Sequence, residues 1–142
     1  MTEYFRFLRK YPSALAFGFV HSFYSSFGQT FFIAFFGASI IAHYQISNTT
    51  YGSIYSLVTL ASSFLLSYFG EMLDRYSFRR MSLFVSFGLA LAAASMYFAD
   101  SLLALAASLF LLRLFGQGLT PLTGSTMMGK FFQKSRGKSL AI

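Results

Sequence analysis

Long apolar runs, separated by short polar or charged stretches, dominate the pattern of this sequence. Four of these runs are between 19 and 30 residues long. A helix needs about 20 apolar residues to cross roughly 30 Å of hydrocarbon, so each run is predicted to be a transmembrane helix. The four predicted spans are residues 13–42, 51–69, 81–99 and 102–128. The first is so long that it must tilt or emerge from the bilayer at one end.

Basic residues gather in three of the stretches outside these spans. Residues 1–12 are predicted to form an amphipathic lead-in, 70–80 a loop, and 129–142 a basic tail that runs into the start of a fifth span. These stretches hold 10 of the 11 lysines and arginines, whereas the connections 43–50 and 100–101 hold none. Short loops rich in Lys and Arg stay in the cytoplasm. The amino terminus and all three basic stretches are therefore predicted to be cytoplasmic.

The composition indicates an all-α integral membrane protein. Of the 142 residues, 56% are hydrophobic and only 11% are charged, which lies outside the range of ordinary globular domains. The net charge of +7 comes from clusters between apolar runs, so the lipid bilayer rather than nucleic acid is the expected partner. There is no cysteine and the two histidines lie far apart, so no metal site or cofactor is expected. The spans contain no carboxylate pair or nucleophile with a base, so an enzyme is not expected.

The most densely charged stretch lies between the second and third spans. It reads G-x-x-x-D-R-x-S-x-R-R over residues 70–80 and resembles the loop between helices two and three of the major facilitator superfamily (MFS) of transporters. The matching residues are Gly70, Asp74, Arg75, Arg79 and Arg80, with Ser77 where that family most often has glycine. The resemblance implies a latch, in which the acid contacts a helix of the other half and the arginines tie down the cytoplasmic side. Alternatively, the arginines only set topology and contact anionic lipid.

One basic residue, Arg113, falls about midway along the fourth span. Arginine at the centre of a membrane helix costs about 2.5–3.5 kcal/mol on insertion scales, so it needs a partner or a water-filled cavity. Arg113 and Gln117 belong to a stretch R-x-x-x-Q-G, which resembles an element in the fourth helix of the same superfamily that is linked to proton coupling or anion binding. The alternative is that Arg113 only braces helices through a hydrogen bond to a carbonyl. Pro121 is expected to bend this span.

Polar residues also share predicted faces of the first two spans. His21, Tyr24 and Gln29 recur at helical spacing in the first span, so they are predicted to line a cavity together. The alternative is that His21 is a neutral side chain hydrogen-bonded to a neighbouring helix. In the second span a polar stripe indicates helix packing or a cavity wall. Its members are Ser56, Thr59, Ser63 and Ser67.

Two further stretches resemble bacterial facilitators related to the monocarboxylate and oxalate–formate carriers. They are residues 28–33 in the first span and 131–141 after the fourth. The resemblance implies a twelve-helix transporter of two six-helix halves in the bacterial inner (plasma) membrane. This chain would be its amino-terminal fragment, without the later helices that complete the path. It would carry a small solute by alternating access, as a symporter or antiporter, with Arg113 favouring an organic anion and with proton coupling left open.

Two other functions fit four spans. A complete carrier that dimerises, as in the small multidrug resistance family, has the same number of helices. That family relies on a glutamate in its first helix, however, and residues 13–42 contain no acid. The other possibility is a non-transporting accessory subunit, which would fold stably from these four helices alone.

Overall fold

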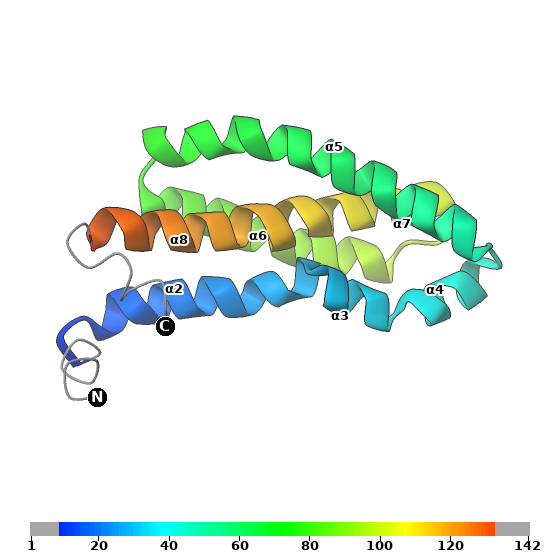
Figure 1. Ribbon diagram of the computed structural model, residues 1–142, viewed down its shortest axis with the longest axis horizontal. Helices are drawn as coiled ribbons and strands as arrows, with labels where there is room; N and C mark the ends of the chain where they lie inside the picture. Colours follow the sequence, from blue (N-terminus) through cyan, green and yellow to red (C-terminus); the bar gives the residue numbers. More distant parts are fainter. Residues whose placement is uncertain (1–8, 133–142) are drawn as a thin grey trace.

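The structure, a computed structural model, describes residues 9–132 apart from the side chain of Asp74. All elements in this part of the chain are helices (Figure 1), so the predicted all-α fold is confirmed. In chain order they are α2 Pro12–Ser25, η1 Ser26–Gly28, α3 Thr30–Phe35, α4 Gly37–Tyr44, α5 Asn48–Arg75, α6 Phe78–Tyr97, α7 Leu102–Leu111, η2 Leu112–Leu119 and α8 Thr120–Phe131. Of these, η1 is a 3-10 helix and η2 a π-helix. Most of the predicted lead-in and of the basic tail lies outside the described residues.

Three helical stretches are long and apolar enough to cross a membrane. They are Asn48–Leu73, Phe78–Tyr97 and Leu102–Phe131. A fourth crossing exists if the bent pair Pro12–Phe35 and Gly37–Tyr44 is counted as one span. Length and composition therefore agree with the membrane protein that the apolar runs predict.

The first span is broken twice, whereas the sequence predicted one helix over 13–42. At Gln29 the backbone is extended, with φ −73° and ψ 149°. At Phe36 the chain changes direction, and α4 lies at 66° to the preceding helical stretch. The first break changes the hydrogen bonding, because the amide of Phe32 donates to the carbonyl of Gln29 at 3.1 Å instead of to the carbonyl one residue earlier. The carbonyl of Gly28 is therefore free to accept a bond from elsewhere.

Short turns with side-chain caps join the other spans. Gln45, directly after α4, takes the left-handed conformation with φ 52°. The hydroxyl of Ser47 then accepts a hydrogen bond from the amide of Thr50 at 3.0 Å, and Ser101 accepts in the same way from the amide of Ala104 at 3.2 Å. An N-cap hydroxyl satisfies one of the free amides at a helix start. These caps explain why α5 and α7 begin where they do.

The predicted loop over residues 70–80 is much shorter in the structure. Helix α5 continues to Arg75 and α6 begins at Phe78, so only Tyr76 and Ser77 lie between them. Ser77 has φ −66° and ψ 142°, an extended conformation that side chains adopt without strain, so this turn needs no glycine. The charged motif consists mainly of the last turns of α5 and the first turn of α6.

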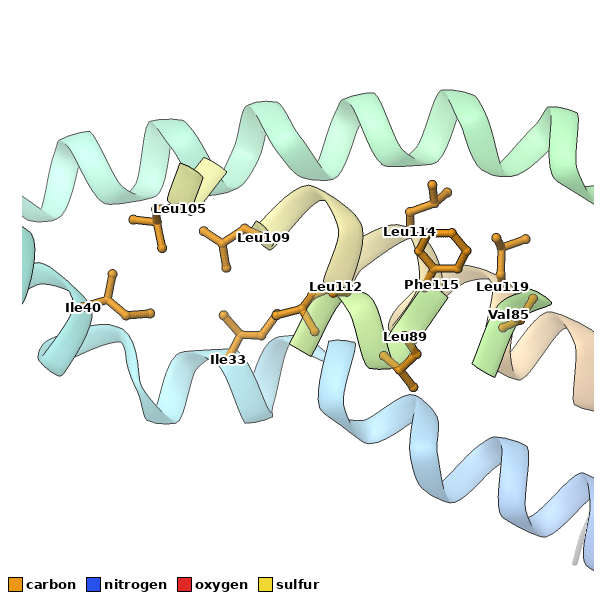
Figure 2. Close-up of a cluster of buried hydrophobic side chains, with 11 residues drawn as sticks. Ile33, Ile40, Val85, Leu89, Leu105, Leu109, Leu112, Leu114, Phe115 and Leu119 are labelled. Carbon is orange, nitrogen blue, oxygen red and sulfur yellow. The ribbon is translucent and has the colours of Figure 1, made fainter. Parts of the chain in front are cut away.

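The fourth span, formed by α7, η2 and α8, is the centre of the packing and lies between α2 and α5 (Figure 1). Of its most apolar window 56% is buried within the protein, against 28% for α6 and 6% for α5. It supplies most of the core cluster in Figure 2, which contains Ile33, Ile40, Val85, Leu89, Ala92, Leu105, Leu109, Leu112, Leu114, Phe115 and Leu119. Side chains on the fourth span can therefore reach all three of the other spans.

Within the fourth span, η2 widens the helix where the sequence predicted a bend. The amide of Thr120 donates to the carbonyl of Phe115, five residues earlier, and the Thr120 hydroxyl donates to the same carbonyl at 2.6 Å. Pro121 has no N–H to donate, and its ring would clash with the carbonyl four residues earlier. A wider turn avoids that clash. Such π-helical turns inside α-helices occur frequently at functional sites, and this one contains Arg113.

Candidate functional site

Arg113 extends from η2 into the interior of the bundle and is only 6% exposed. Its Nη1 donates to the carbonyl of Gly28 at 3.3 Å and to Oγ1 of Thr30 at 3.0 Å. Its Nε donates to Oγ1 of Thr59 at 3.2 Å. The Gly28 carbonyl is available because the break at Gln29 removes its helical partner. One guanidinium thus binds the first span at its break and the second span at its middle.

Tyr55 of α5 covers the guanidinium. Its ring centroid lies 5.1 Å from Cζ of Arg113, which is within the range of a cation–π contact. Its hydroxyl donates to Oγ1 of Thr30 at 3.2 Å. Thr59, one turn further along α5, donates its own hydroxyl to the backbone carbonyl of Tyr55 at 2.7 Å, which turns a lone pair toward Arg113. We call Arg113, Thr30, Tyr55 and Thr59 the Arg113 cluster.

The positive charge of this cluster has no acidic partner among the described side chains. Glu71 forms its ion pair with Arg75, and Asp100 lines a different cavity of about 620 Å³ next to α4 and the α6–α7 turn. Arginine stays protonated in proteins. Hydroxyls and a carbonyl solvate that charge without cancelling it. The Arg113 cluster is therefore an electropositive site within the membrane-spanning part of the chain, where an anion would be attracted.

Gln117 lies one turn after Arg113, next to the break in the first span. A Cβ placed on Gly28 would lie 2.5 Å from the backbone nitrogen of Gln117, so the two backbones touch here. Oε1 of Gln117 is buried and has no hydrogen-bond partner among the described residues. A buried acceptor without a partner costs about 1–3 kcal/mol. Gln29 forms the break itself, and its side chain does not cap α3.

His21 and Tyr24 lie apart from the Arg113 cluster. They line a cavity of about 340 Å³ between α2 and α6, with Leu89 among its walls. His21 Nδ1 lies 2.9 Å from the carbonyl of Phe17, and Nε2 lies 3.0 Å from Oγ of Ser82 in α6. Because a carbonyl can only accept, Nδ1 carries a hydrogen, and in the neutral ring Nε2 then accepts from Ser82. The contact with Ser82 joins His21 to a neighbouring helix, as the second interpretation of this histidine predicts.

The predicted common face of His21, Tyr24 and Gln29 does not extend past the break in the first span. Helical spacing keeps residues on one face only while the helix is continuous, and Gln29 is already in extended backbone. The structure therefore brings Arg113 and Gln117 to the break at Gln29. It turns His21 and Tyr24 toward α6 instead.

The charged motif at the α5–α6 turn is exposed. Nη2 of Arg75 lies 3.7 Å from Oε2 of Glu71, and the two side chains are 76% and 71% exposed. A pair this exposed contributes little to stability. Arg79 and Arg80 in the first turn of α6 are also exposed. The motif arginines are thus accessible to a partner or to lipid headgroups.

The remaining motif positions are Gly70 and Asp74. A Cβ on Gly70 would lie 4.0 Å from Leu122 Cδ2 of α8, which is ordinary van der Waals contact, so packing does not require glycine there. The side chain of Asp74 lies outside the described part of the structure. The acid of the predicted latch therefore has no described geometry.

The ends of three spans lie together at the same end of the bundle as this turn. Nζ of Lys130, near the end of α8, lies 5.5 Å from the ring centroid of Phe78 at the start of α6. The ring of Tyr11, directly before α2, lies 5.2 Å from that of Phe132 after α8. The start of the first span, the α5–α6 turn and the end of the fourth span therefore lie at one end, as the charge pattern predicts.

Sequence reasoning missed Thr30, Tyr55 and the Gly28 carbonyl. Thr59 was part of the predicted stripe in the second span, but the other stripe members are exposed. A usable signal was present, because Tyr55 and Thr59 lie one turn apart and both can accompany a buried arginine. No pattern of side chains indicates that a backbone carbonyl becomes available.

Comparison with protein families gives a match over most of the chain. Residues 18–142 match the family model described as Major Facilitator Superfamily. No curated protein and no solved structure matches the chain. The matched residues contain the whole Arg113 cluster and the α5–α6 turn.

Proposed function

The chain belongs to the Major Facilitator Superfamily, and we propose that it binds a small organic anion at the Arg113 cluster during transport. Members of this family are membrane transporters of small solutes rather than enzymes. The chain is accordingly an integral membrane protein whose partners are the bilayer and a small-molecule substrate. The observation that carries the anion proposal is the buried charge of Arg113 without a described acidic partner.

A permanent charge in this position is an expensive way to brace helices. Inserting arginine at the middle of a membrane helix costs about 2.5–3.5 kcal/mol. The three protein hydrogen bonds of Arg113 go to neutral acceptors on the first and second spans. A neutral donor such as glutamine could make bonds of this kind at lower cost. Reversible binding of an anion during transport would explain why this position has a charged residue instead of a neutral donor.

We propose that Gln117 and Gln29 form the walls of the path next to Arg113. The buried, unpartnered Oε1 of Gln117 supports this role, because it can accept a hydrogen bond from a protonated ligand or a water. A cavity of about 450 Å³ lies between α2, α5 and α8 and has Ser22 and Gly118 among its uncharged walls. A Cβ on Gly118 would lie 3.5 Å from the backbone carbonyl of Arg113. The substrate path would continue through this cavity.

His21 and Tyr24 belong to a different surface in this proposal. Their cavity adjoins α6, and the bond between His21 and Ser82 serves to hold α2 and α6 together. Substrate contact by these two residues, which the sequence alone suggested, has no support from their described contacts.

Transport would proceed by alternating access, with two halves rocking around a site near the middle of the membrane. The described helices would then be the first four of a twelve-helix carrier, and later helices would complete the path beside the Arg113 cluster. The low burial of α5, 6% within the protein, is compatible with a second half packing against it. Membership of the superfamily leaves the small multidrug resistance alternative without support.

The motif Gly70, Asp74, Arg75, Arg79 and Arg80 would act as the cytoplasmic latch between the halves. The exposure of its arginines supports this role, because exposed side chains are accessible to a partner helix. The gathering of basic residues at that end supports a cytoplasmic location for it and for the amino terminus. The protein would be located in a bacterial inner membrane.

A monocarboxylate is the substrate class that one arginine fits best. A single guanidinium compensates a single negative charge, and the bound anion could be carried together with a proton. The resemblance to monocarboxylate and oxalate–formate carriers agrees with a carboxylate substrate. The Arg113 cluster contains one cation, so a dicarboxylate would require a second cation from outside the cluster.

Transport by the full-length protein in proteoliposomes tests the proposal. The experiment measures uptake of labelled acetate, lactate and oxalate by the wild type and by the Arg113→Gln and Arg113→Lys variants. Arg9→Gln is a matched control, because it removes an exposed positive charge. We expect Arg113→Gln to abolish uptake while leaving membrane insertion intact, Arg113→Lys to retain part of it, and Arg9→Gln to behave as wild type. Carboxylate uptake that survives Arg113→Gln would refute the proposal.

A further inference from the structure

The hydroxyl of Thr30 has both of its acceptor positions occupied. A threonine hydroxyl offers one donor hydrogen and two acceptor lone pairs. Oγ1 of Thr30 accepts from Nη1 of Arg113 at 3.0 Å and from the hydroxyl of Tyr55 at 3.2 Å. No described hydrogen bond has this hydroxyl as its donor. Thr30 is an exposed residue, so its hydrogen is left for a group that is not part of the described chain.

Arg113 has a donor left over in the same way. The single hydrogen on Nε goes to Thr59, and the two bonds from Nη1 go to Gly28 and Thr30. Nη2 makes no described hydrogen bond, so its two N–H groups remain. Thr59 has no spare capacity of this kind, because its hydrogen is donated to the carbonyl of Tyr55.

The two unused donors are Nη2 of Arg113 and the hydroxyl of Thr30. They belong to different spans, but the two side chains are hydrogen-bonded to each other. Nη1 of Arg113, which shares its carbon with Nη2, is 3.0 Å from Oγ1 of Thr30. An acceptor near both groups would receive one hydrogen bond from the guanidinium N–H of the fourth span and one from the hydroxyl of the first span. No acceptor on the described side chains fills this position. A pair of donors next to an uncompensated charge matches the two oxygens of a carboxylate.

From this count we propose that Thr30 is a second anion-binding residue, and that Tyr55 is the positioning residue which directs the Thr30 hydrogen toward the anion. The inference rests on the proposed function, since it adds a ligand to the same site. Tyr55 acts by occupying a lone pair of Thr30, so the Thr30 hydrogen cannot turn back toward α5. One carboxylate group bound by Arg113 and Thr30 together is the ligand chemistry that this arrangement selects.

The competing explanation is that Thr30 only braces Arg113. A brace needs Oγ1 as an acceptor, and the donor hydrogen is irrelevant to it. Thr30→Val removes both the bracing role and the anion-binding role, and Thr30→Ser keeps both. A third variant is therefore needed to separate the two roles. Tyr55→Phe separates the roles, because it keeps the ring over Arg113 and the bond from Arg113 to Thr30. It removes only the group that orients the Thr30 hydrogen.

Acetate-dependent thermal stabilisation of the full-length protein in lipid nanodiscs measures binding without requiring transport. A ligand that binds the folded state raises the unfolding temperature according to its concentration and affinity. Sodium chloride replaces sodium acetate at each concentration, so ionic strength stays constant. The variants are Thr30→Val, Thr30→Ser, Tyr55→Phe and Arg113→Gln, with Thr49→Val as the control for an exposed threonine near the start of α5.

We expect Thr30→Val to weaken the apparent acetate affinity about tenfold to a hundredfold, the effect of losing one hydrogen bond to a charged group. Thr30→Ser and Thr49→Val should bind acetate within about threefold of wild type, since each keeps the donor at position 30. Tyr55→Phe should fall between Thr30→Val and wild type, with an unfolding temperature in chloride close to that of wild type.

The outcomes separate the two proposals. If Arg113→Gln loses acetate binding while Thr30→Val and Tyr55→Phe bind as wild type does, the role of Thr30 is overturned and the anion site at Arg113 stands. If Tyr55→Phe alone binds as wild type does, Tyr55 is not a positioning residue. If acetate stabilises neither the wild type nor any variant beyond chloride, or stabilises Arg113→Gln equally, both proposals fail together.

Discussion

The backbones of Gly28 and Gly116 touch where the first and fourth spans cross. A Cβ on Gly28 would lie 2.6 Å from Cα of Gly116, and a Cβ on Gly116 would lie 2.6 Å from Cα of Gly28. Small residues allow this close approach between membrane helices. The contact brings the free carbonyl of Gly28 to 3.3 Å from Nη1 of Arg113, so the glycine pair determines whether the Arg113 cluster can form.

Either alanine substitution at this crossing should destabilise the protein. In Gly28→Ala and Gly116→Ala the added methyl meets backbone atoms, which cannot rotate away as a side chain can. We expect a loss of about 1–3 kcal/mol or more, the usual cost of overpacking, and a loss of substrate binding. Thermal unfolding of the full-length protein in nanodiscs measures the first effect. Gly52→Ala is the control, because a Cβ there meets nothing within 4 Å; equal unfolding temperatures for all three variants would contradict the contact.

A second glycine contact should be repairable. A Cβ on Gly88 of α6 would lie 2.2 Å from Cε1 of Phe115, so Gly88→Ala should destabilise the packing of α6 on the fourth span. Here the obstacle is a side chain, and Phe115→Leu in the same protein should restore part of the loss. A double-mutant cycle of unfolding free energies should give a coupling of about 0.5–3 kcal/mol. Strictly additive effects would show that the two residues do not meet.

The bond from Ser82 to His21 should be a modest tie between α2 and α6. Ser82→Ala removes the donor to Nε2 of His21, and hydrogen bonds between membrane helices are worth about 0.6 kcal/mol on average and at most about 1.7. We therefore expect a small fall in unfolding free energy and no loss of substrate binding. Ser86→Ala is the matched control, since Ser86 lines the same cavity and has no described bond to His21. Nitrogen NMR of labelled His21 should show the Nδ1–H tautomer; an Nε2–H signal would contradict the assigned bond.

Pro121 should be the cause of the wide turn in η2. In Pro121→Ala the restored N–H can donate to the carbonyl of Gln117, which favours an ordinary α-helix through this region. A π-helix rises less per residue than an α-helix, so the fourth span should lengthen. These 142 residues contain no cysteine, so in a protein with any other cysteines replaced, spin labels on Leu103→Cys and Ser125→Cys report the distance between α7 and α8. An unchanged distance would indicate that the wide turn does not depend on the proline.

The same substitution should impair the Arg113 cluster. Shifting the register by part of a turn moves Arg113 relative to α8 and strains its bonds to Thr30 and Thr59. We expect Pro121→Ala to weaken acetate binding by about tenfold, which corresponds to the loss of roughly one hydrogen bond to a charged group. Pro12→Ala is the control for proline replacement, because Pro12 lies in the first turn of α2, where a missing N–H costs nothing.

The sequence by itself determined that the chain is helical, that it crosses a membrane, and that Arg113 is unusual. These conclusions depend on the hydropathy of contiguous residues, and hydropathy requires no knowledge of which helices meet. The gathering of the basic clusters at one end also followed from the sequence, because it depends only on the order and number of the spans. Gln117 was identified for a similar reason, since it lies one turn from Arg113 on the same continuous stretch.

The tertiary structure alone decided which groups surround Arg113. The break at Gln29 separated His21 and Tyr24 from the rest of the predicted face, and the turn before Pro121 is π-helical. The ligands of Arg113 are a carbonyl freed by that break and hydroxyls from two other spans. These partners lie 54 to 85 residues away along the chain. The first and fourth spans approach closely at the contact between Gly28 and Gly116. A periodic pattern along one helix contains no information about the helix packed against it, so the sequence could not predict this contact.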